Sequence, residues 1–191
     1  MDDLIAALRR GQPVLLPTDT VYGLVSLPSE SAVAALYELK GRAAEQPTAL
    51  LAASAEQLVQ AVPELDRSRL LRGPYTLVLP NPARRYPWLA GNREDTIGVR
   101  LPDLTPAAAA VLQAVGCVAA TSANDPGGHD PLTLGDVPQR LRDACPSLDE
   151  GPLPGVPSTV VDLTGPEPRV LREGAVPAEE AVARVRAARG Q

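Results

Sequence analysis

The residues of this sequence that could carry chemistry are basic and hydroxyl side chains at the ends of apolar runs. Lys40 is the single lysine among 18 basic residues, and only Gly41 separates it from Arg42. The dipole of a helix ending there favours a cation, but it does not select lysine. Lysine carries a compact ammonium on a slim stem, whereas arginine carries a planar fork. The lone lysine therefore suggests a site in which the fork does not fit.

Two further polar clusters interrupt apolar runs. In "PTDTVYGL" (17–24), two hydroxyls and a carboxylate could bind a small polar ligand, although the same residues are typical of an ordinary turn. In "TSANDPGG" (121–128), small residues precede a Gly-Gly pair that allows close backbone approach. That stretch matches neither GxxxxGK[ST] nor GxGxxG, and an ordinary exit from a strand explains it equally well.

Three more polar residues stand at the ends of predicted strands. Ser158 opens "STVVDL", Arg172 ends "RVLR", and Arg100 ends "TIGVR". An arginine in such a place is often only a solvated charge. Together with the clusters above, these side chains make an inventory suited to holding anionic groups.

The residues that the sequence lacks narrow the chemistry. The single histidine, His129, has no cysteine or histidine partner, which argues against a zinc site. A Ser-His-Asp triad would have to use that same residue. Cys117 and Cys145 fit neither a disulfide framework nor a metal pattern. An inventory of Lys, Arg, Thr, Ser and Asn without a dedicated base suits phosphoryl or nucleotidyl transfer, where positioning and electrostatics dominate.

The elements that must position these groups are short strands and helices. The strands come in neighbouring pairs at 13–26 and 159–172, so a mixed sheet with helices on it fits better than an all-parallel sheet. Helices are predicted at 3–10, 29–40, 55–61, 107–115, 136–145 and 177–190, the third with a capping box formed by Ser54 and Gln57. Strands are predicted at 13–17, 20–26, 48–53, 75–80, 96–102, 117–124, 158–163 and 169–173.

The bulk properties set the broad class. A length of 191 residues with 45% hydrophobic residues predicts a single domain over 1–191. A net charge of −5 argues against a surface devoted to nucleic acid, although a local basic cleft remains open. The start has acidic residues where a signal peptide needs basic ones, and no apolar run is long enough to cross a bilayer. We expect a soluble, cytoplasmic protein without membrane partners.

Taken together, the motifs resemble the Sua5/YrdC/YciO family. The resemblance spans residues 13–174 and is closest to the short YrdC type. It implies an α/β fold in which a twisted, open, mixed sheet with flanking helices surrounds a concave cleft. The motifs occur in the family's order: "PTDTVYGL", Lys40-x-Arg42, "GPYTLVLP", "TIGVRLP", Ser122-x-Asn124, "PSTVVDL" and "VLREG".

The resemblance implies an L-threonylcarbamoyladenylate synthase, a nucleotidyltransferase. Such an enzyme joins L-threonine, bicarbonate or CO2, and ATP, and releases pyrophosphate. Its product feeds the modification of adenosine 37 in tRNA, which implies hand-over to a tRNA threonylcarbamoyl transferase. Mg²⁺ would arrive with ATP, and no metal site on the protein itself is implied. The implied residues are Lys40 and Arg42 as catalytic groups; Lys40, Arg42, Thr96, Asn124 and Arg172 for ATP; and Thr20, Arg100, Ser122 and Ser158 for threonine.

Two positions depart from the family pattern. Family members commonly have proline where this chain has Ala43, and some have histidine where it has Leu51. Thr133 or a neighbour could also contact the ligands, but the loop before it is one residue longer than the pattern. These departures leave open a YciO-like paralogue that binds tRNA or double-stranded RNA, or that hydrolyses nucleotide with a different acceptor.

Overall fold

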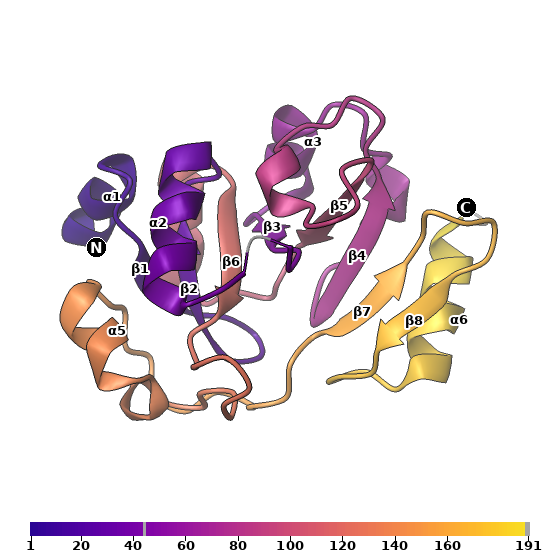
Figure 1. Ribbon diagram of the computed structural model, residues 1–191. Coiled ribbons are helices and arrows are strands. Elements are labelled where there is room, and N and C mark those ends of the chain that lie inside the picture. The colour runs from indigo at the N-terminus through magenta and orange to yellow at the C-terminus, as the bar shows by residue number, and fades with distance from the viewer. Residues whose placement is uncertain (44, 190–191) are drawn as a thin grey trace.

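The protein is described by a computed structural model that covers residues 1–43 and 45–189. Its centre is a single eight-stranded sheet with the order β1-β2-β6-β3-β5-β4-β7-β8 (Figure 1). The strands are β1 (Val14–Pro17), β2 (Tyr22–Ser26), β3 (Ala49–Leu51), β4 (Tyr75–Pro80), β5 (Thr96–Arg100), β6 (Val118–Ser122), β7 (Thr159–Asp162) and β8 (Arg169–Arg172).

The helices connect these strands and flank the sheet. The α-helices are α1 (Asp2–Arg9), α2 (Glu30–Lys40), α3 (Ala55–Ala61), α4 (Pro106–Val115), α5 (Gln139–Ala144) and α6 (Ala178–Arg189). Short 3₁₀ turns are η1 (Arg67–Arg69), η2 (Pro87–Leu89) and η3 (Leu134–Asp136). The last residue predicted for the final helix, 190, lies outside the described residues.

The sheet is mixed and open, as predicted. β3 pairs with β5 and β4 pairs with β7 in parallel, whereas the other neighbours are antiparallel. The neighbouring strand pairs seen in the sequence are the antiparallel pairs at the two edges, β1–β2 and β7–β8. The expected α/β class with a twisted mixed sheet and flanking helices is therefore confirmed.

Local capping explains where α2 and α3 begin and end. The Ser29 hydroxyl accepts a hydrogen bond from a backbone amide of the first turn of α2, and Gly41 stops that helix in the left-handed conformation, with φ of 66°. The Ser54 hydroxyl accepts from the backbone amide of Gln57 at the start of α3. The predicted capping box is only half formed, because the Gln57 side chain accepts from the amide of Ala53 instead of Ser54.

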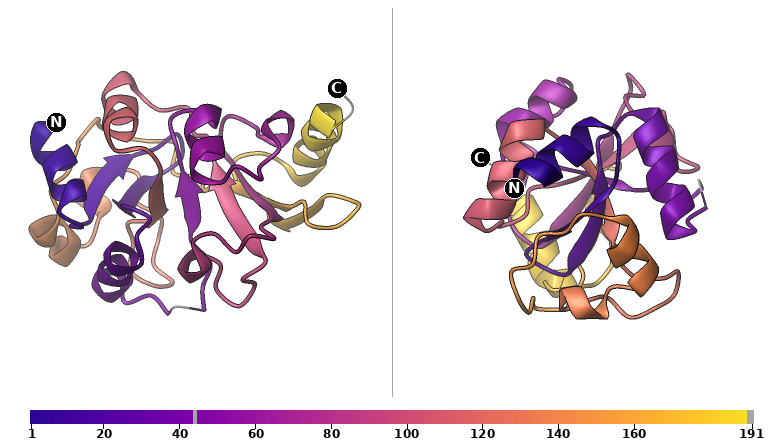
Figure 2. Two further views of the ribbon diagram at one scale, coloured as in Figure 1. Left: turned by 90° about the horizontal axis from the view of Figure 1, so that it is seen from above. Right: turned by 90° about the vertical axis from the view of Figure 1, so that its left-hand side faces the viewer.

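Aliphatic side chains fill the core on both faces of the sheet. The larger cluster packs α2, α3 and α6 against the sheet, and the smaller cluster packs α1 and α4. Figure 2 shows α1 and α4 on the face opposite α2. Apolar packing on both faces fixes the sheet between two helical layers.

A buried carboxylate joins the end of β7 to the loop before β5. Asp162 is 5% exposed and accepts from the Arg93 guanidinium at 2.9 Å and from the Thr164 hydroxyl and amide. Burial alone would raise the Asp162 pKa, but these hydrogen bonds outweigh it and lower the pKa from 3.8 to about 2. The carboxylate therefore anchors Arg93, which also faces the cavity described below.

Replacing Asp162 by asparagine is expected to lower the free energy of unfolding by about 2 kcal/mol at neutral pH. Because the folded pKa is depressed, this stabilisation is complete above 3.8 and is lost as the pH falls toward about 2. Urea unfolding of both proteins across that range measures it. If the difference in free energy of unfolding between wild type and Asp162→Asn stays constant as the pH falls to about 2, the expectation is contradicted.

Candidate functional site

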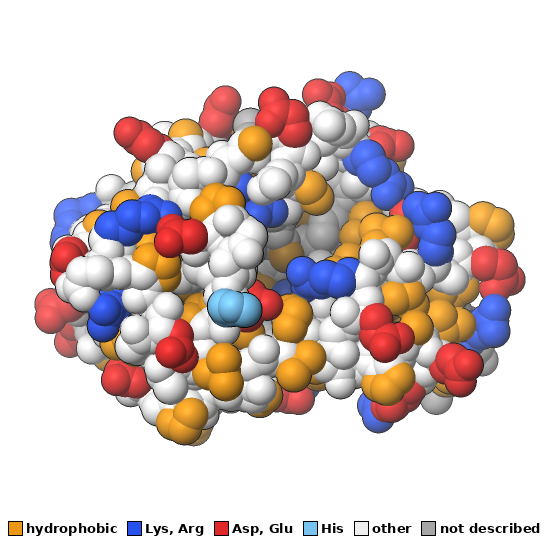
Figure 3. Space-filling view, turned by 60° about the horizontal axis from the view of Figure 1, so that its bottom comes forward, with side chains coloured by type: hydrophobic (Ala, Val, Ile, Leu, Met, Phe, Trp, Pro, Cys, Tyr) orange, Lys and Arg blue, Asp and Glu red, His pale blue; other side chains and the backbone are white. Residues whose placement is uncertain are grey.

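One face of the sheet is hollowed into a cavity of about 550 Å³. Figure 3 shows the hollow with basic side chains at its rim. Its lining comes from the turn between β1 and β2, the segment before β3, and strands β4 to β8. This volume is in the range of sites for small molecules and cofactors.

The lining combines guanidinium groups, hydroxyls and apolar side chains. Among the described residues that line it, Asp130 supplies the one carboxylate. Such a lining suits an anionic ligand that also has polar groups and an apolar part. The lining includes the guanidinium groups of Arg42, Arg93, Arg100 and Arg172, the hydroxyls of Thr18, Thr20, Thr48, Thr76, Thr96, Thr121, Ser122 and Ser158, and, among its apolar side chains, Val78, Val160 and Leu171.

Arg100 is held from behind by the turn between β1 and β2. Its Nη2 donates to the Asp19 carboxylate at 2.8 Å and to the Thr20 hydroxyl at 3.2 Å. The backbone amide of Asp103 donates to the other oxygen of Asp19. Burial lowers the Arg100 pKa, and the neighbouring Asp19 carboxylate opposes that shift. The buried Nε has no hydrogen-bond partner among the described residues, so the fork retains donor capacity.

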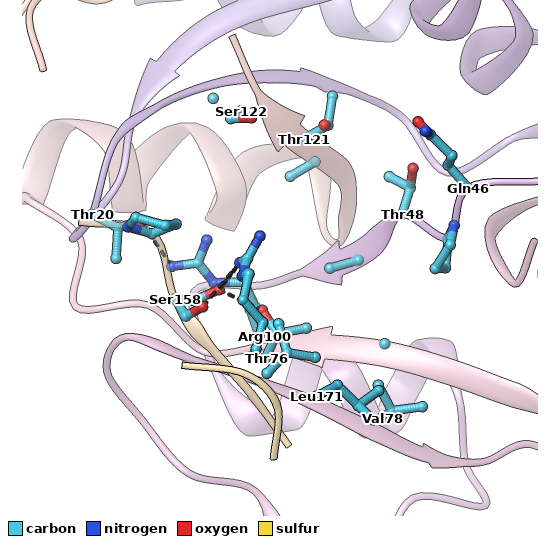
Figure 4. A pocket seen from close by; sticks show the side chains of 18 of the residues that line it. Thr20, Gln46, Thr48, Thr76, Val78, Arg100, Thr121, Ser122, Ser158 and Leu171 are labelled. Atoms are coloured by element: carbon cyan, nitrogen blue, oxygen red, sulfur yellow. Dashed lines mark hydrogen bonds between the residues drawn. The ribbon is translucent and has the colours of Figure 1, made fainter. Parts of the chain in front are cut away.

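A hydroxyl from β4, a hydroxyl from the residue before β7 and an arginine from the edge strand β8 meet beside Arg100. The hydroxyls of Thr76 and Ser158 lie 2.7 Å apart. Arg172 Nη2 donates to the Ser158 carbonyl at 2.9 Å and to its hydroxyl at 3.3 Å. Figure 4 shows Thr76, Ser158 and Arg100 grouped on one side of the cavity, with Gln46 and Thr48 across it.

Arg42 forms the opposite wall. One of its terminal nitrogens donates to the Pro47 carbonyl at 2.7 Å and the other to the Thr121 hydroxyl at 3.4 Å. Its Nε is buried without a partner among the described residues. Gly91 packs against this same segment, because a Cβ there would overlap the Glu45 carbonyl oxygen. The backbone at Gly91 and the backbone at Glu45 therefore lie in close contact.

Lys40 lies behind the cavity and does not line it. The residue is 3% exposed, and its ammonium donates to the Ser122 carbonyl at 2.7 Å and to the Asn124 side-chain oxygen at 2.6 Å. It also donates to the Asn124 carbonyl. Burial and then the nearby Arg42 charge lower the Lys40 pKa from 10.5 to about 8. The ammonium thus occupies a confined place with three oxygen acceptors.

The profile of the Sua5/YciO/YrdC family, whose description is "telomere recombination", matches residues 6–174. The chain belongs to this family. A threonylcarbamoyl-AMP synthase of Pyrococcus abyssi is 36% identical over 182 residues, which are 91% of this chain and 53% of that protein. A Mycobacterium tuberculosis protein with the same name, given provisionally, is 39% identical over 92% of this chain and 84% of its own length.

Two solved structures of the family share the fold. P. abyssi Sua5 complexed with L-threonine superposes with a TM-score of 0.84 at 34% identity, covering 95% of this chain and 55% of that one. Escherichia coli YciO superposes with a TM-score of 0.79 at 25% identity, covering 93% and 90%. The chain therefore spans about half the length of the Pyrococcus protein and nearly all of YciO.

Sequence reasoning named part of the lining of this Sua5/YciO/YrdC cavity. Of the nine predicted site residues, Lys40 and Asn124 lie behind the lining and seven belong to it. The ligand roles assigned to all nine stay predictions. The seven are Thr20, Arg42, Thr96, Arg100, Ser122, Ser158 and Arg172.

Sequence reasoning missed several lining residues. Gln46, Thr48, Thr76 and Arg93 also face the cavity. The polar position inside "YTLVLP" could have signalled Thr76, because alternate residues of a strand share one face. Nothing in the local sequence marks the loop residues, which reach the cavity through tertiary contacts.

The structure shows where Leu51 and Thr133, which the family pattern left in doubt, lie relative to the cavity. Leu51 is 2% exposed in the smaller apolar cluster and does not line the cavity. Thr133 is not a lining residue either. It precedes η3, and its backbone amide and hydroxyl donate to the carboxylate of Asp136, the last residue of η3. In the same loop region, Asp130 reaches the cavity instead.

The described residues include neither a metal-binding cluster nor a membrane-spanning helix. Among the described residues, no group of three or more His, Cys, Asp or Glu side chains could hold a metal ion. No helix in the described part of the chain is long and apolar enough to span a membrane.

Proposed function

We propose that the chain is an L-threonylcarbamoyladenylate synthase, which makes threonylcarbamoyl-AMP and pyrophosphate from L-threonine, bicarbonate or CO2, and ATP. The observation that carries the proposal is the cavity, where four guanidinium groups and eight hydroxyls converge beside an apolar area. A relative of 36% identity bears the name of this enzyme, and a relative of the same fold was solved with L-threonine bound.

The lining offers groups that suit both substrates. The threonine carboxylate would lie against the fork of Arg100, with Thr20, Ser122 and Ser158 around the rest of the amino acid. ATP would extend along Arg42, Thr96 and Arg172. The apolar side chains of Val78 and Leu171 give the adenine base a surface to pack against.

The proposed reaction has two steps. The threonine amine first takes up CO2, loses a proton and becomes an N-carboxylate. A carboxylate oxygen then attacks the α-phosphate of ATP, and the bond from that phosphorus to the bridging oxygen breaks to release pyrophosphate. Arg42 and Arg172 would neutralise the charge that builds up on the phosphates. Arg100 would hold the amino acid in place, so its contribution is positioning.

Mg²⁺ would enter this cavity bound to the phosphates of ATP. The lining provides one carboxylate among the described residues, Asp130, which is too few for a metal cage made by the protein. Mg²⁺ would supply charge neutralisation on the phosphates. The residues of this chain bind and orient the two organic substrates.

The test is pyrophosphate release from ATP in the presence of L-threonine and bicarbonate. We expect release that requires threonine, together with a product whose mass is that of threonylcarbamoyl-AMP. Release that is equal without threonine, or no release at all, would rule out the synthase. A reaction with each other amino acid in place of threonine serves as the specificity control.

The likeness to E. coli YciO, which this chain matches over nearly its whole length, supports a second candidate. A YciO-like paralogue would bind RNA or hydrolyse nucleotide with a different acceptor. Binding of tRNA that weakens steeply with salt, without amino-acid-dependent pyrophosphate release, would favour it. Preferential stimulation by another amino acid would instead identify a different acceptor.

The product of the proposed synthase is an acyl adenylate, which is labile and therefore needs an acceptor enzyme close by. We propose that the product passes to a tRNA threonylcarbamoyl transferase in the cytoplasm and that the domain extends over residues 1–191. Co-incubation with such a transferase and tRNA should transfer label from threonine to tRNA only when both proteins are present.

A further inference from the structure

The turn at Ser122–Asn124 directs three oxygens toward one point. They are the carbonyls of Ser122 and Asn124 and the side-chain oxygen of Asn124, and all three accept from the Lys40 ammonium. An ammonium has three donors, so its donor capacity is used by this turn. Oxygens that converge in a buried place repel one another unless a cation lies between them.

The same contact fixes the orientation of the Asn124 amide. The side-chain oxygen of Asn124 faces the Lys40 ammonium. If the amide were flipped, its NH2 group would face the ammonium, and two hydrogen-bond donors would then point at each other. The amide nitrogen donates to the Gly128 carbonyl at 2.7 Å, which agrees with the observed orientation. Both the oxygen and the nitrogen of the Asn124 side-chain amide therefore have hydrogen-bond partners.

The Ser122 hydroxyl is fixed through this amide. It lies 2.7 Å from the Asn124 side-chain oxygen, which can only accept, so the Ser122 hydroxyl must donate its proton there. Ser122 also lines the cavity. Because its proton is used in this hydrogen bond, the Ser122 hydroxyl can act toward a ligand only as a hydrogen-bond acceptor.

We propose that Lys40 is a positioning residue that closes the Ser122–Asn124 turn and makes Ser122 a hydrogen-bond acceptor for a donor group of the ligand. The inference rests on the proposed function, in which the amino acid brings amine and hydroxyl donors. It assigns Lys40 an action through the turn, separate from the phosphate contact that the family resemblance implies.

Arginine cannot replace Lys40 in this arrangement. Its donors lie in one plane and spread over a wide fork, whereas the three acceptors here converge on a single atom. This geometry explains why the one lysine of the chain stands at position 40.

The charges around Lys40 come from three segments. Arg42 follows on the same loop, Asp125 and Asp130 belong to the loop after β6, and Arg140 belongs to α5. The two arginines and burial disfavour the protonated form, and the two carboxylates favour it. Lys40 is mostly protonated at neutral pH and loses its proton as the pH rises through its pKa of about 8. Above that pH the turn should loosen.

The first measurement is amide hydrogen exchange of residues 122–128 in the protein without substrates. In Lys40→Met and in Lys40→Arg, we expect exchange of this segment to accelerate about tenfold or more, because charged hydrogen bonds are lost. Arg186→Lys, at an exposed ion pair on α6, serves as the matched control and should not change it. Unchanged protection in Lys40→Met would overturn the proposal.

The second measurement uses the wild-type chain and needs no variant to fold. Protection of 122–128, compared with that of α4 and corrected for intrinsic exchange, should fall between pH 7 and pH 9. Constant relative protection would contradict the proposal. Since exchange requires no substrate, it separates this inference from the synthase proposal, which fails only if threonine-dependent pyrophosphate is absent.

The third measurement separates positioning from general stability. The wild-type kcat/KM for threonine should have an alkaline limb near pH 8 that Lys40→Met lacks, with a fall of about a hundredfold at neutral pH. A variant that keeps the limb, or that loses only thermal stability, would show that Lys40 does not act through Ser122.

Discussion

Replacing Arg100 by lysine is expected to lower kcat/KM for threonine by about 10²- to 10³-fold while the protein stays folded. The guanidinium of Arg100 already gives one terminal nitrogen to Asp19 and Thr20, and the rest of the fork remains for a ligand carboxylate. Lysine keeps the charge but is a single point donor, so it cannot bind Asp19 and hold a carboxylate bidentately at the same time.

Steady-state pyrophosphate release at varied threonine and at varied ATP tests the Arg100→Lys prediction. We expect the KM for threonine to rise far more than the KM for ATP, because the proposed contact is with the amino acid. Arg186→Lys, an exposed exchange of the same type, is the control and should leave both constants unchanged. Equal KM values for threonine in Arg100→Lys and wild type would show that Arg100 does not hold the carboxylate.

Replacing Gly174 by alanine is expected to lower the free energy of unfolding by about 3 kcal/mol and to weaken binding at Ser158. A Cβ at position 174 would overlap the Pro157 carbonyl oxygen and would crowd the Ser158 carbonyl group, both of them backbone atoms. The amide of Gly174 also donates to the Thr159 hydroxyl, so the two segments cannot simply separate. The strand start that carries Ser158 must therefore shift.

Thermal unfolding and threonine binding by calorimetry measure the two effects of Gly174→Ala. Gly165→Ala is the matched control, because a Cβ at that position meets only the Glu167 carbonyl, at an ordinary 3.9 Å. We expect the control to keep both stability and affinity. A Gly174→Ala protein as stable as the control would mean that the 157–158 segment yields easily and does not constrain the site.

The sequence predicted much of the fold because its signals are local. The stop of α2 at Gly41 needs only a residue that tolerates positive φ, and the start of α4 needs only Thr105 followed by proline. The pairs of strands without a helix between them at both ends of the chain sufficed to indicate a mixed sheet. The strand order in between, where β6 separates β2 from β3, depends on packing between distant segments.

What the sequence determined by itself about the site was its inventory: one lysine, hydroxyls and arginines at strand ends, in an order that resembles one family. The tertiary structure decided the partners of these groups. Lys40 is brought to Asn124 across 84 positions of sequence, and Arg100 to Asp19 across 81. Such pairs form because the sheet places remote strand ends side by side, and no local pattern encodes that juxtaposition. The sequence thus showed that Lys40 is unusual, and the fold showed the three oxygens that require an ammonium there.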